Sequence, residues 1–274
     1  MLRAVSQALE NAGAFVRALT GWRRFLFALI TGLLSALSFA PFGFFPFLLL
    51  AFAVLVLLID GAQSHARPVR SAAFAGWAFG FGHFLAGLYW VGYAFVVDAV
   101  DHAWQLPFVA LIFPGGLALF TALTCALAAR FWRPGLARIF LFAALYAASE
   151  WLRGHIFTGF PWNIPAYAWG ASLSILQSVS LIGAYGLSLL TVLLGAALAV
   201  FFGLEKPRAW LMPAAMVALF LDLWCGGWAR LALVHTPDVP GVNLRIVQPD
   251  VPQQEKYTPE LRARNWRRLV LQSV

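Results

Sequence analysis

Long uncharged, apolar runs fill most of the sequence between Arg24 and Arg230, and such runs can fold stably only in a lipid bilayer. The chain is 62% hydrophobic and only 11% charged, whereas soluble domains carry roughly a quarter charged residues. A helix needs about 20 apolar residues to cross a bilayer. The sequence therefore predicts an all-α, polytopic membrane domain over residues 24–230.

Seven transmembrane helices are expected in this domain. The run 25–59 is too long for one helix and contains Pro41, Gly43 and Pro46, which favour a turn between two helices. The third span is rich in glycine, which permits close helix packing. The other five expected spans are residues 71–96, 106–129, 139–151, 178–202 and 209–227.

Basic residues alternate between the loops and predict the orientation of the chain. Eleven Lys and Arg residues lie in the N-terminal segment and in the second, fourth and sixth loops, against Arg153 alone in the opposite loops. Basic loops stay in the cytoplasm, so the N-terminus is expected there and the C-terminus in the periplasm of a bacterial inner membrane. The net charge of +8 thus fits the membrane, and no nucleic-acid partner is expected.

The two ends of the chain differ from the apolar middle. Residues 1–23 predict a helix with one apolar stripe, which is typical of an interfacial segment on the inner leaflet. Residues 241–248 alternate as in a strand, and Thr258-Pro259-Glu260 is a helix start. A lone strand and helix cannot bury a core. Residues 241–274 are therefore expected to begin an α/β domain that continues beyond residue 274.

The stretch after the fifth span is the strongest candidate for a site. Residues 155–169 (HIFTGFPWNIPAYAW) cannot form a regular helix, and irregular backbone at membrane depth needs protein or a water-lined cavity around it. Glu150 and Arg153 are three residues apart and can pair on one helix face. Two interpretations remain open: an ion pair that closes the helix end, or an Arg153 that meets a lipid phosphate while Glu150 orients it.

Other polar groups in the spans give weaker indications. His83 and Asp222 are functional candidates because ionisable groups inside a membrane are costly, although His83 is also typical of a satisfied contact between helices. Cys125 and Cys225 lie in apolar segments without metal-ligand spacing. We therefore expect no metal site and no cofactor.

Several segments together resemble the apolipoprotein N-acyltransferases of bacterial inner membranes. They are SFAP at 38–41, GWAFG at 76–80, YWV at 89–91, EWLRG at 150–154, TGFPW at 158–162 and IVQPDVPQ at 246–253, followed by Lys256 and Tyr257. The resemblance implies a membrane domain followed by a periplasmic nitrilase-like domain. It also implies transfer of an acyl chain from a phospholipid, typically phosphatidylethanolamine, to the diacylglyceryl cysteine that begins an apolipoprotein.

The resemblance further implies a Glu-Lys-Cys triad that works through a Cys thioester. All three residues are expected beyond position 274, so this chain holds no catalytic residue and should be inactive alone. Tyr257 and Pro249 depart from the family pattern, where many members have Trp and Gly. The substrate-binding candidates carried over to this sequence are Glu150, Arg153, Gly159, Pro161, Trp162 and Tyr257.

Two other functions remain alternatives. A polytopic transporter would also have seven or more spans, but transporters place polar groups near the bilayer midplane, whereas the charges here crowd the outer edge. A membrane scaffold with a short periplasmic tail would explain the arginines after residue 244 as a docking surface. It would leave the aromatic stretch at 155–169 unexplained.

Overall fold

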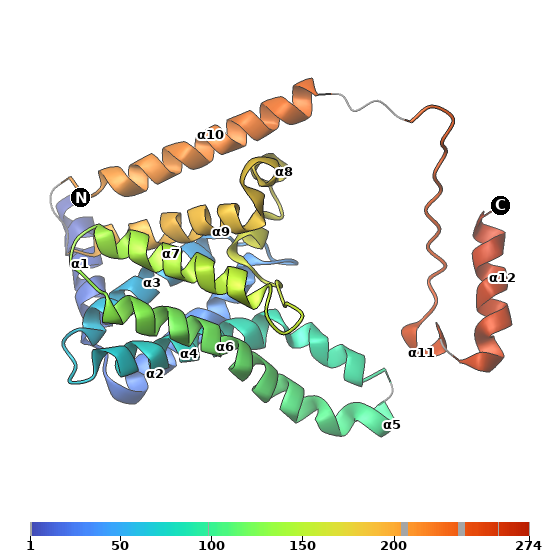
Figure 1. Ribbon diagram of the computed structural model, residues 1–274, viewed down its shortest axis with the longest axis horizontal. Helices are drawn as coiled ribbons and strands as arrows, with labels where there is room; N and C mark the ends of the chain where they lie inside the picture. The colour runs from blue at the N-terminus through green and yellow to red at the C-terminus, as the bar shows by residue number, and fades with distance from the viewer. Residues whose placement is uncertain (1, 98, 204–207, 235–238, 257, 274) are drawn as a thin grey trace.

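The computed structural model describes the chain except residues 1, 98, 204–207, 235–238, 257 and 274. The described residues form helices and loops, without a strand. Long helices lie side by side in a bundle, and α1 crosses one end of it (Figure 1). The long helices are α1 (Leu2–Ala18), α2 (Gly21–Ser35), α3 (Pro46–Ala62), α4 (Pro68–Gly87), α6 (Leu106–Arg130), α7 (Ala137–Arg153), α9 (Val179–Ala197) and α10 (Leu211–Leu233).

Short helices connect or extend the long ones. The short α-helices are α5 (Ala99–His102), α8 (Leu173–Leu176), α11 (Gln253–Lys256) and the somewhat longer α12 (Arg262–Ser273). The 3₁₀ helices are η1 (Ala36–Ser38), η2 (Tyr89–Phe95), η3 (Ala103–Gln105), η4 (Pro165–Trp169), η5 (Leu198–Phe202) and η6 (Pro259–Leu261).

A helix occupies each place where a span was expected. Among the described residues, three helical stretches are long and apolar enough to cross a membrane: Ala99–Arg130, Val179–Phe202 and Leu211–Leu233. Pro46–Ala62 is apolar but shorter. The expected span 71–96 is corrected, because α4 ends at Gly87 and residues 89–95 continue as 3₁₀ helix. The total of seven crossings stays a prediction.

The core of the bundle is built around α3. The successive residues Leu55, Val56 and Leu57 are at most 1% exposed, and successive positions of a helix point about 100° apart, so they lie on different faces of α3. A helix that is hydrophobic all round is expected to be covered on all sides. Helices α1, α2, α4 and α9 all contact it. In α6 and α10, by contrast, large apolar side chains such as Ile112 and Trp228 are exposed, at 66% and 59%.

The crossing of α2 and α4 depends on two glycines. A Cβ added at Gly32 would lie 2.0 Å from the carbonyl oxygen of Phe79, and one at Gly82 would lie 2.3 Å from that of Leu29. Either contact is far below van der Waals distance, so the two backbones can touch only because neither position has a side chain. Small residues permit such close packing of membrane helices, as expected for the glycine-rich third span.

The C-terminal segment lies apart from the bundle in Figure 1. The strand expected at 241–248 is not formed: this stretch is extended, and Leu244 and Ile246 are 90% and 96% exposed. A strand needs a partner for its backbone hydrogen bonds, and the described residues supply none. The expected helix is confirmed, since η6 begins at Pro259 and α12 follows it. The start of a nitrilase-like domain stays a prediction.

We expect Gly82→Leu to separate α2 from α4 and to lower stability by about 1–3 kcal/mol or more, because the obstructing atom is backbone and cannot rotate away. Thermal unfolding in detergent measures the effect. Gly226→Leu in α10 is the matched control, because no described heavy atom lies within 4 Å of a Cβ at that position. Equal unfolding temperatures for the two variants would contradict this account of the crossing.

Candidate functional site

A buried arginine joins the last turn of α7 to the loop that follows it. Arg153 is 2% exposed. Its Nε donates to Glu150 Oε1 at 3.4 Å, and its Nη2 donates to Glu150 Oε2. Its Nη1 donates to the carbonyl oxygen of Trp162 at 2.9 Å and also to that of Phe160. A guanidinium has five N–H donors in a rigid fork, and this geometry uses four of them.

The loop closes tightly enough for these carbonyls to reach Arg153. Residues 157–159 all have positive φ angles, with Gly159 at 83°. A Cβ on Gly159 would lie 2.2 Å from the carbonyl oxygen of Gly154, so only glycine fits this close approach. The amide of Phe160 then donates to the carbonyl oxygen of Arg153 at 3.0 Å. Backbone and side chain of Arg153 therefore both fix the loop.

The second half of the irregular stretch is sunk into the bundle. Ile164 and Trp169 are 1% and 8% exposed. The amide of Ala166 donates to Ser188 Oγ at 3.1 Å, and Trp169 Nε1 donates to Thr191 Oγ1 at 2.8 Å. Hydroxyls on α9 thus satisfy polar groups of the irregular chain, as buried backbone and side-chain donors require.

The first half of the stretch carries exposed aromatic side chains. Trp162 is 45% exposed and stacks on Phe160, with ring centroids 4.9 Å apart. Phe160 in turn meets the edge of Phe113 on α6 at 5.0 Å, and Pro161 between the two loop aromatics is half-buried. The loop therefore rests on α6 and presents the indole of Trp162 outward.

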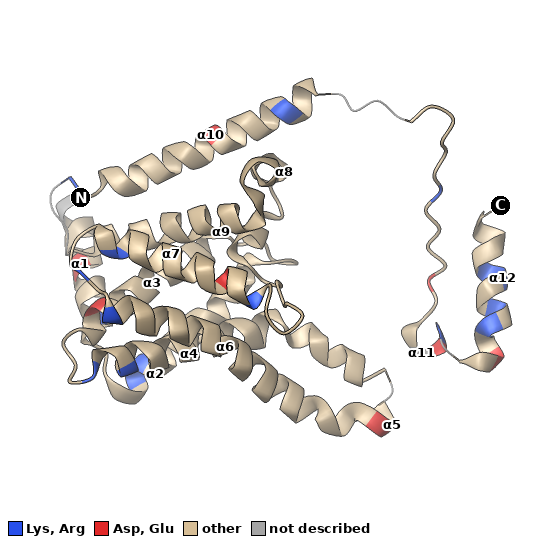
Figure 2. Cartoon of the chain, in the orientation of Figure 1, with Lys and Arg blue, Asp and Glu red and all other residues tan. Residues whose placement is uncertain are grey.

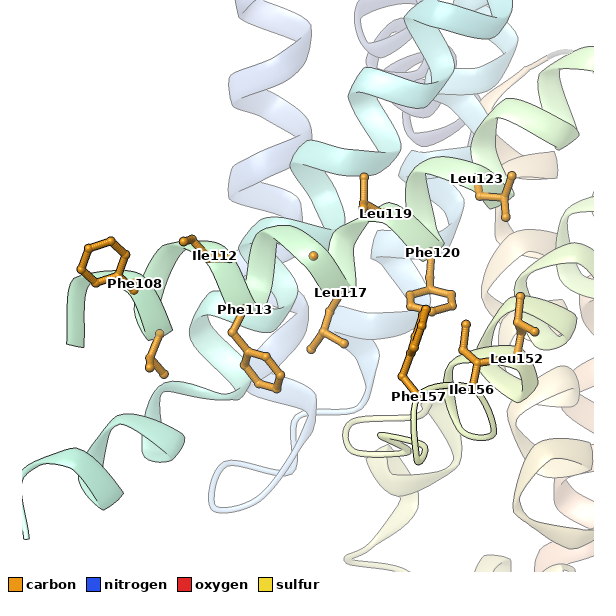
Figure 3. A pocket seen from close by; sticks show the side chains of 12 residues that line it. Phe108, Ile112, Phe113, Leu117, Leu119, Phe120, Leu123, Leu152, Ile156 and Phe157 are labelled. Atoms are coloured by element: carbon orange, nitrogen blue, oxygen red, sulfur yellow. The ribbon is translucent and has the colours of Figure 1, made fainter. Parts of the chain in front are cut away.

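An apolar groove runs from this loop along α6. It has a volume of about 770 Å³. Figure 3 shows its lining, in which every side chain is hydrocarbon. Phe108, Ile112 and Phe120 come from α6, Leu152 comes from the last turn of α7, and Phe157 comes from the loop. The length of the groove thus follows α6, and its loop end lies beside the Arg153 contacts.

His83 joins two helices of the bundle. It is 3% exposed, and its Nδ1 lies 2.7 Å from Ser35 Oγ at the end of α2. Its ring also meets the ring of Phe39, after η1, with the ring centroids 5.5 Å apart. The structure therefore places His83 as a polar link between α4 and the end of α2.

The structure brings five of the six predicted substrate-side residues into one unit. Glu150 and Arg153 form its buried brace, and the other three, Gly159, Pro161 and Trp162, belong to the loop that the brace holds. The sixth, Tyr257, lies outside the described residues. Among the other candidates, Asp222 is exposed on α10, Cys225 is exposed on the same helix, and Cys125 is buried between α4 and α6.

Sequence reasoning missed two parts of the site. Phe84 lies under the Arg153 guanidinium, with the cation 5.0 Å from the ring centroid. The groove on α6 was also missed, because the helix is apolar on every side and its sequence does not distinguish a groove-lining residue from a lipid-facing one. In the sequence, Phe84 is one of many phenylalanines in apolar segments, and nothing there indicates that its ring contacts a cation.

Most of the chain matches one known protein family. The family described as apolipoprotein N-acyltransferase N-terminal domain matches residues 31–197, which include the brace and the loop. The chain belongs to the apolipoprotein N-acyltransferase family. Its relatives include the apolipoprotein N-acyltransferases of Rhodopseudomonas palustris (46% identical), Bradyrhizobium diazoefficiens (45%) and Caulobacter vibrioides (42%).

The matches cover most of this chain but less than half of each relative. The three alignments cover 89%, 86% and 87% of this chain, but only 46%, 45% and 44% of the relatives. The chain thus spans about half the length of the curated relatives it matches. The brace, the loop and the groove lie inside the region that matches the N-terminal domain of the family.

We expect Arg153→Gln to release the loop and to destabilise the fold by about 3–5 kcal/mol, because Glu150 is left buried without its partner. Hydrogen exchange of the amides of Gly159 and Phe160 should become fast. Glu150→Gln is the informative comparison: it removes the charge but leaves the two carbonyl contacts, so these amides should stay protected. Protection of the loop in Arg153→Gln would contradict the proposed brace.

Proposed function

We propose that this chain is the membrane part of an apolipoprotein N-acyltransferase of a bacterial inner membrane. The reaction would move an acyl chain from a phospholipid, phosphatidylethanolamine, to the α-amino group of the diacylglyceryl cysteine of an apolipoprotein. The observation that carries the proposal is the juxtaposition of a braced aromatic loop with a hydrocarbon-lined groove. Membership of the family supports the same reading.

The groove suits one acyl chain of the phospholipid donor. Its volume of about 770 Å³ lies within the range of ligand sites, about 300–1,000 Å³. Lipid tails are as apolar as leucine, so moving a chain from bilayer to groove gains little hydrophobic free energy. The groove therefore contributes position: a chain lying along α6 would bring its ester linkage toward the loop end.

The loop would act on the polar part of the substrates. The exposed indole of Trp162 is placed to contact a headgroup, because tryptophan favours the interface between lipid and water. Pro161 and Gly159 give the loop its shape, and Tyr257 is proposed as a further substrate contact. Arg153 and Glu150 act as positioning residues, since four donors of the guanidinium already bind protein oxygens.

The covalent chemistry is assigned to residues outside this chain. A cysteine thiolate would attack the phospholipid ester, forming a thioester and releasing lysophospholipid, and the amine would then attack the thioester. Glutamate would serve as the base and lysine would stabilise the oxyanion. Cys125 is buried and Cys225 faces away from the core on α10, so neither suits this role, and the chain alone is proposed to be inactive.

Filling the groove tests the acyl-chain site. No described heavy atom lies within 4 Å of a Cβ at Gly116, so Gly116→Phe fills the groove without a steric clash. In the full-length enzyme we expect acyl transfer to fall about tenfold or more, which corresponds to about 1.4 kcal/mol of lost positioning. The readout is acylation of a diacylglyceryl peptide by phosphatidylethanolamine in vesicles.

Gly226→Phe on α10 is the control for this experiment, since it adds the same side chain to another open position. Its activity should stay within about twofold of the parent. Trp162→Ala tests the loop separately and should slow transfer without changing membrane insertion. Unchanged acyl transfer in Gly116→Phe would contradict the proposed role of the groove. Unchanged acyl transfer in Trp162→Ala would contradict the proposed role of the loop.

The proposed orientation places the loop in the outer leaflet and the C-terminus in the periplasm. The basic residues of the bundle support it, since most lie at the end where α1 lies (Figure 2). Alkaline phosphatase fused after residue 274 should be active, because it folds only outside the cytoplasm. The same enzyme fused after His65, in the opposite loop, should be inactive. The reverse pattern would overturn the orientation.

A further inference from the structure

A second pocket lies at the other end of the bundle, between the first turns of α2 and α4. These two helices pack side by side, and both begin at the basic end. The pocket has a volume of about 300 Å³. Its lining residues are Gly21, Trp22, Arg24, Phe25, Ser71, Phe74 and Ala75.

Arg24 lines this pocket and carries two unsatisfied hydrogen-bond donors. The residue is 3% exposed, and its Nη2 donates to the carbonyl oxygen of Leu58 on α3. Its Nε and Nη1 are buried and have no hydrogen-bond partner among the described residues. No ion pair of Arg24 is found in that part of the chain either. A buried donor without an acceptor costs about 1–3 kcal/mol, and more for a charged group, so the position favours an external acceptor.

The first turns of the two helices add to the positive potential. Neither helix has a side-chain cap or an acidic residue in its first turn. The uncapped amides of a helix start attract anions, and the helix dipole acts in the same direction. Gly21 and Trp22 at the start of α2 line the pocket, and Ser71 comes from the first turn of α4, so the positive ends of both helix dipoles lie near the cation of Arg24.

The histidine beside the pocket, His65, is held in its neutral form. His65, in the loop before α4, lies with its Nδ1 2.8 Å from Ser71 Oγ. Burial lowers the pKa of His65, and the nearby charge of Arg24 lowers it further. At neutral pH His65 is therefore uncharged and adds no competing positive charge. The described charges that face the pocket are thus those of arginines.

The outer wall of the pocket is aromatic and faces outward. Trp22 and Phe74 are 70% and 55% exposed. Arg23 lies over the Trp22 ring at 5.7 Å, and Arg70 lies over the Phe74 ring at 5.5 Å. Tryptophan and arginine pairs of this kind are typical of the headgroup layer. A ligand there would thus meet charge inside the pocket and hydrocarbon beside it.

We propose that the pocket between α2 and α4 binds the phosphate of an anionic phospholipid, which accepts hydrogen bonds from Nε and Nη1 of Arg24. Each N–H group of a guanidinium can donate a charge-assisted hydrogen bond to a phosphate oxygen. The pocket is large enough for the phosphate and glycerol, and the acyl chains would lie along the exposed faces of Phe25 and Phe74. An anionic headgroup is favoured over ethanolamine, whose ammonium would be repelled by Arg23 and Arg70.

Native mass spectrometry of the delipidated full chain in detergent tests the proposal. The probes are phosphatidylglycerol, phosphatidylethanolamine and inorganic phosphate. We expect phosphatidylglycerol to bind most tightly, and Arg24→Gln to weaken its binding about tenfold, as loss of a charge-assisted pair predicts. Arg130→Gln is the matched control: Arg130 is exposed over Phe131 at 5.5 Å, at the end of α6, and does not line this pocket.

A second variant keeps the test decisive if Arg24→Gln fails to fold. Ser71→Leu fills the pocket but leaves the bond from Arg24 to Leu58 intact, and it should weaken phosphatidylglycerol binding to a similar degree. Equal binding in the parent, Ser71→Leu and Arg130→Gln would overturn the site. Displacement of phosphatidylglycerol by inorganic phosphate at equal concentration would overturn the assignment to a lipid. Acyl transfer is not involved in either outcome, because the pocket lies at the end of the bundle opposite the loop.

Discussion

The guanidinium of Arg153 connects a regular helical bundle to an irregular loop, and the arrangement of the candidate site depends on that connection. Glu150 neutralises the cation within one helical turn, and the carbonyls of Phe160 and Trp162 draw the loop back over the end of α7. Moving a cation from water into the protein interior costs several kcal/mol. Only several well-placed hydrogen-bond acceptors can offset this desolvation penalty. The loop supplies those acceptors, and the arginine in turn fixes the shape of the loop.

Two buried arginines lie at opposite ends of the bundle, and they differ in the number of hydrogen-bond acceptors that the protein offers them. Arg153 has a carboxylate and two carbonyls, so its geometry is that of a structural brace. Arg24 has one carbonyl and two unsatisfied nitrogens beside a pocket. The same side chain can therefore hold a protein together or attract a ligand. The difference lies in the number of protein oxygens within reach.

Packing in the bundle relies on shape more than on the hydrophobic effect. A bilayer offers apolar side chains an environment like that of the protein interior, so helices gain mainly from close van der Waals contact. The glycines at the crossing of α2 and α4 provide that contact. On α6, Gly116 faces open space instead and leaves the groove unfilled. Glycine thus permits close approach in one place and an acyl-sized hollow in another.

The sequence by itself determined the membrane class, the positions of the long helices, the basic end and the family, because hydropathy, charge alternation and short motifs are local properties. It also placed Glu150 and Arg153 on one helix face. Tertiary structure alone decided that α3 is enclosed while α6 is open, that Arg153 reaches the loop carbonyls and that Arg24 does not find enough acceptors. Apolar helices have similar sequences whether protein or lipid surrounds them, and a side chain's partners come from segments far away in the chain.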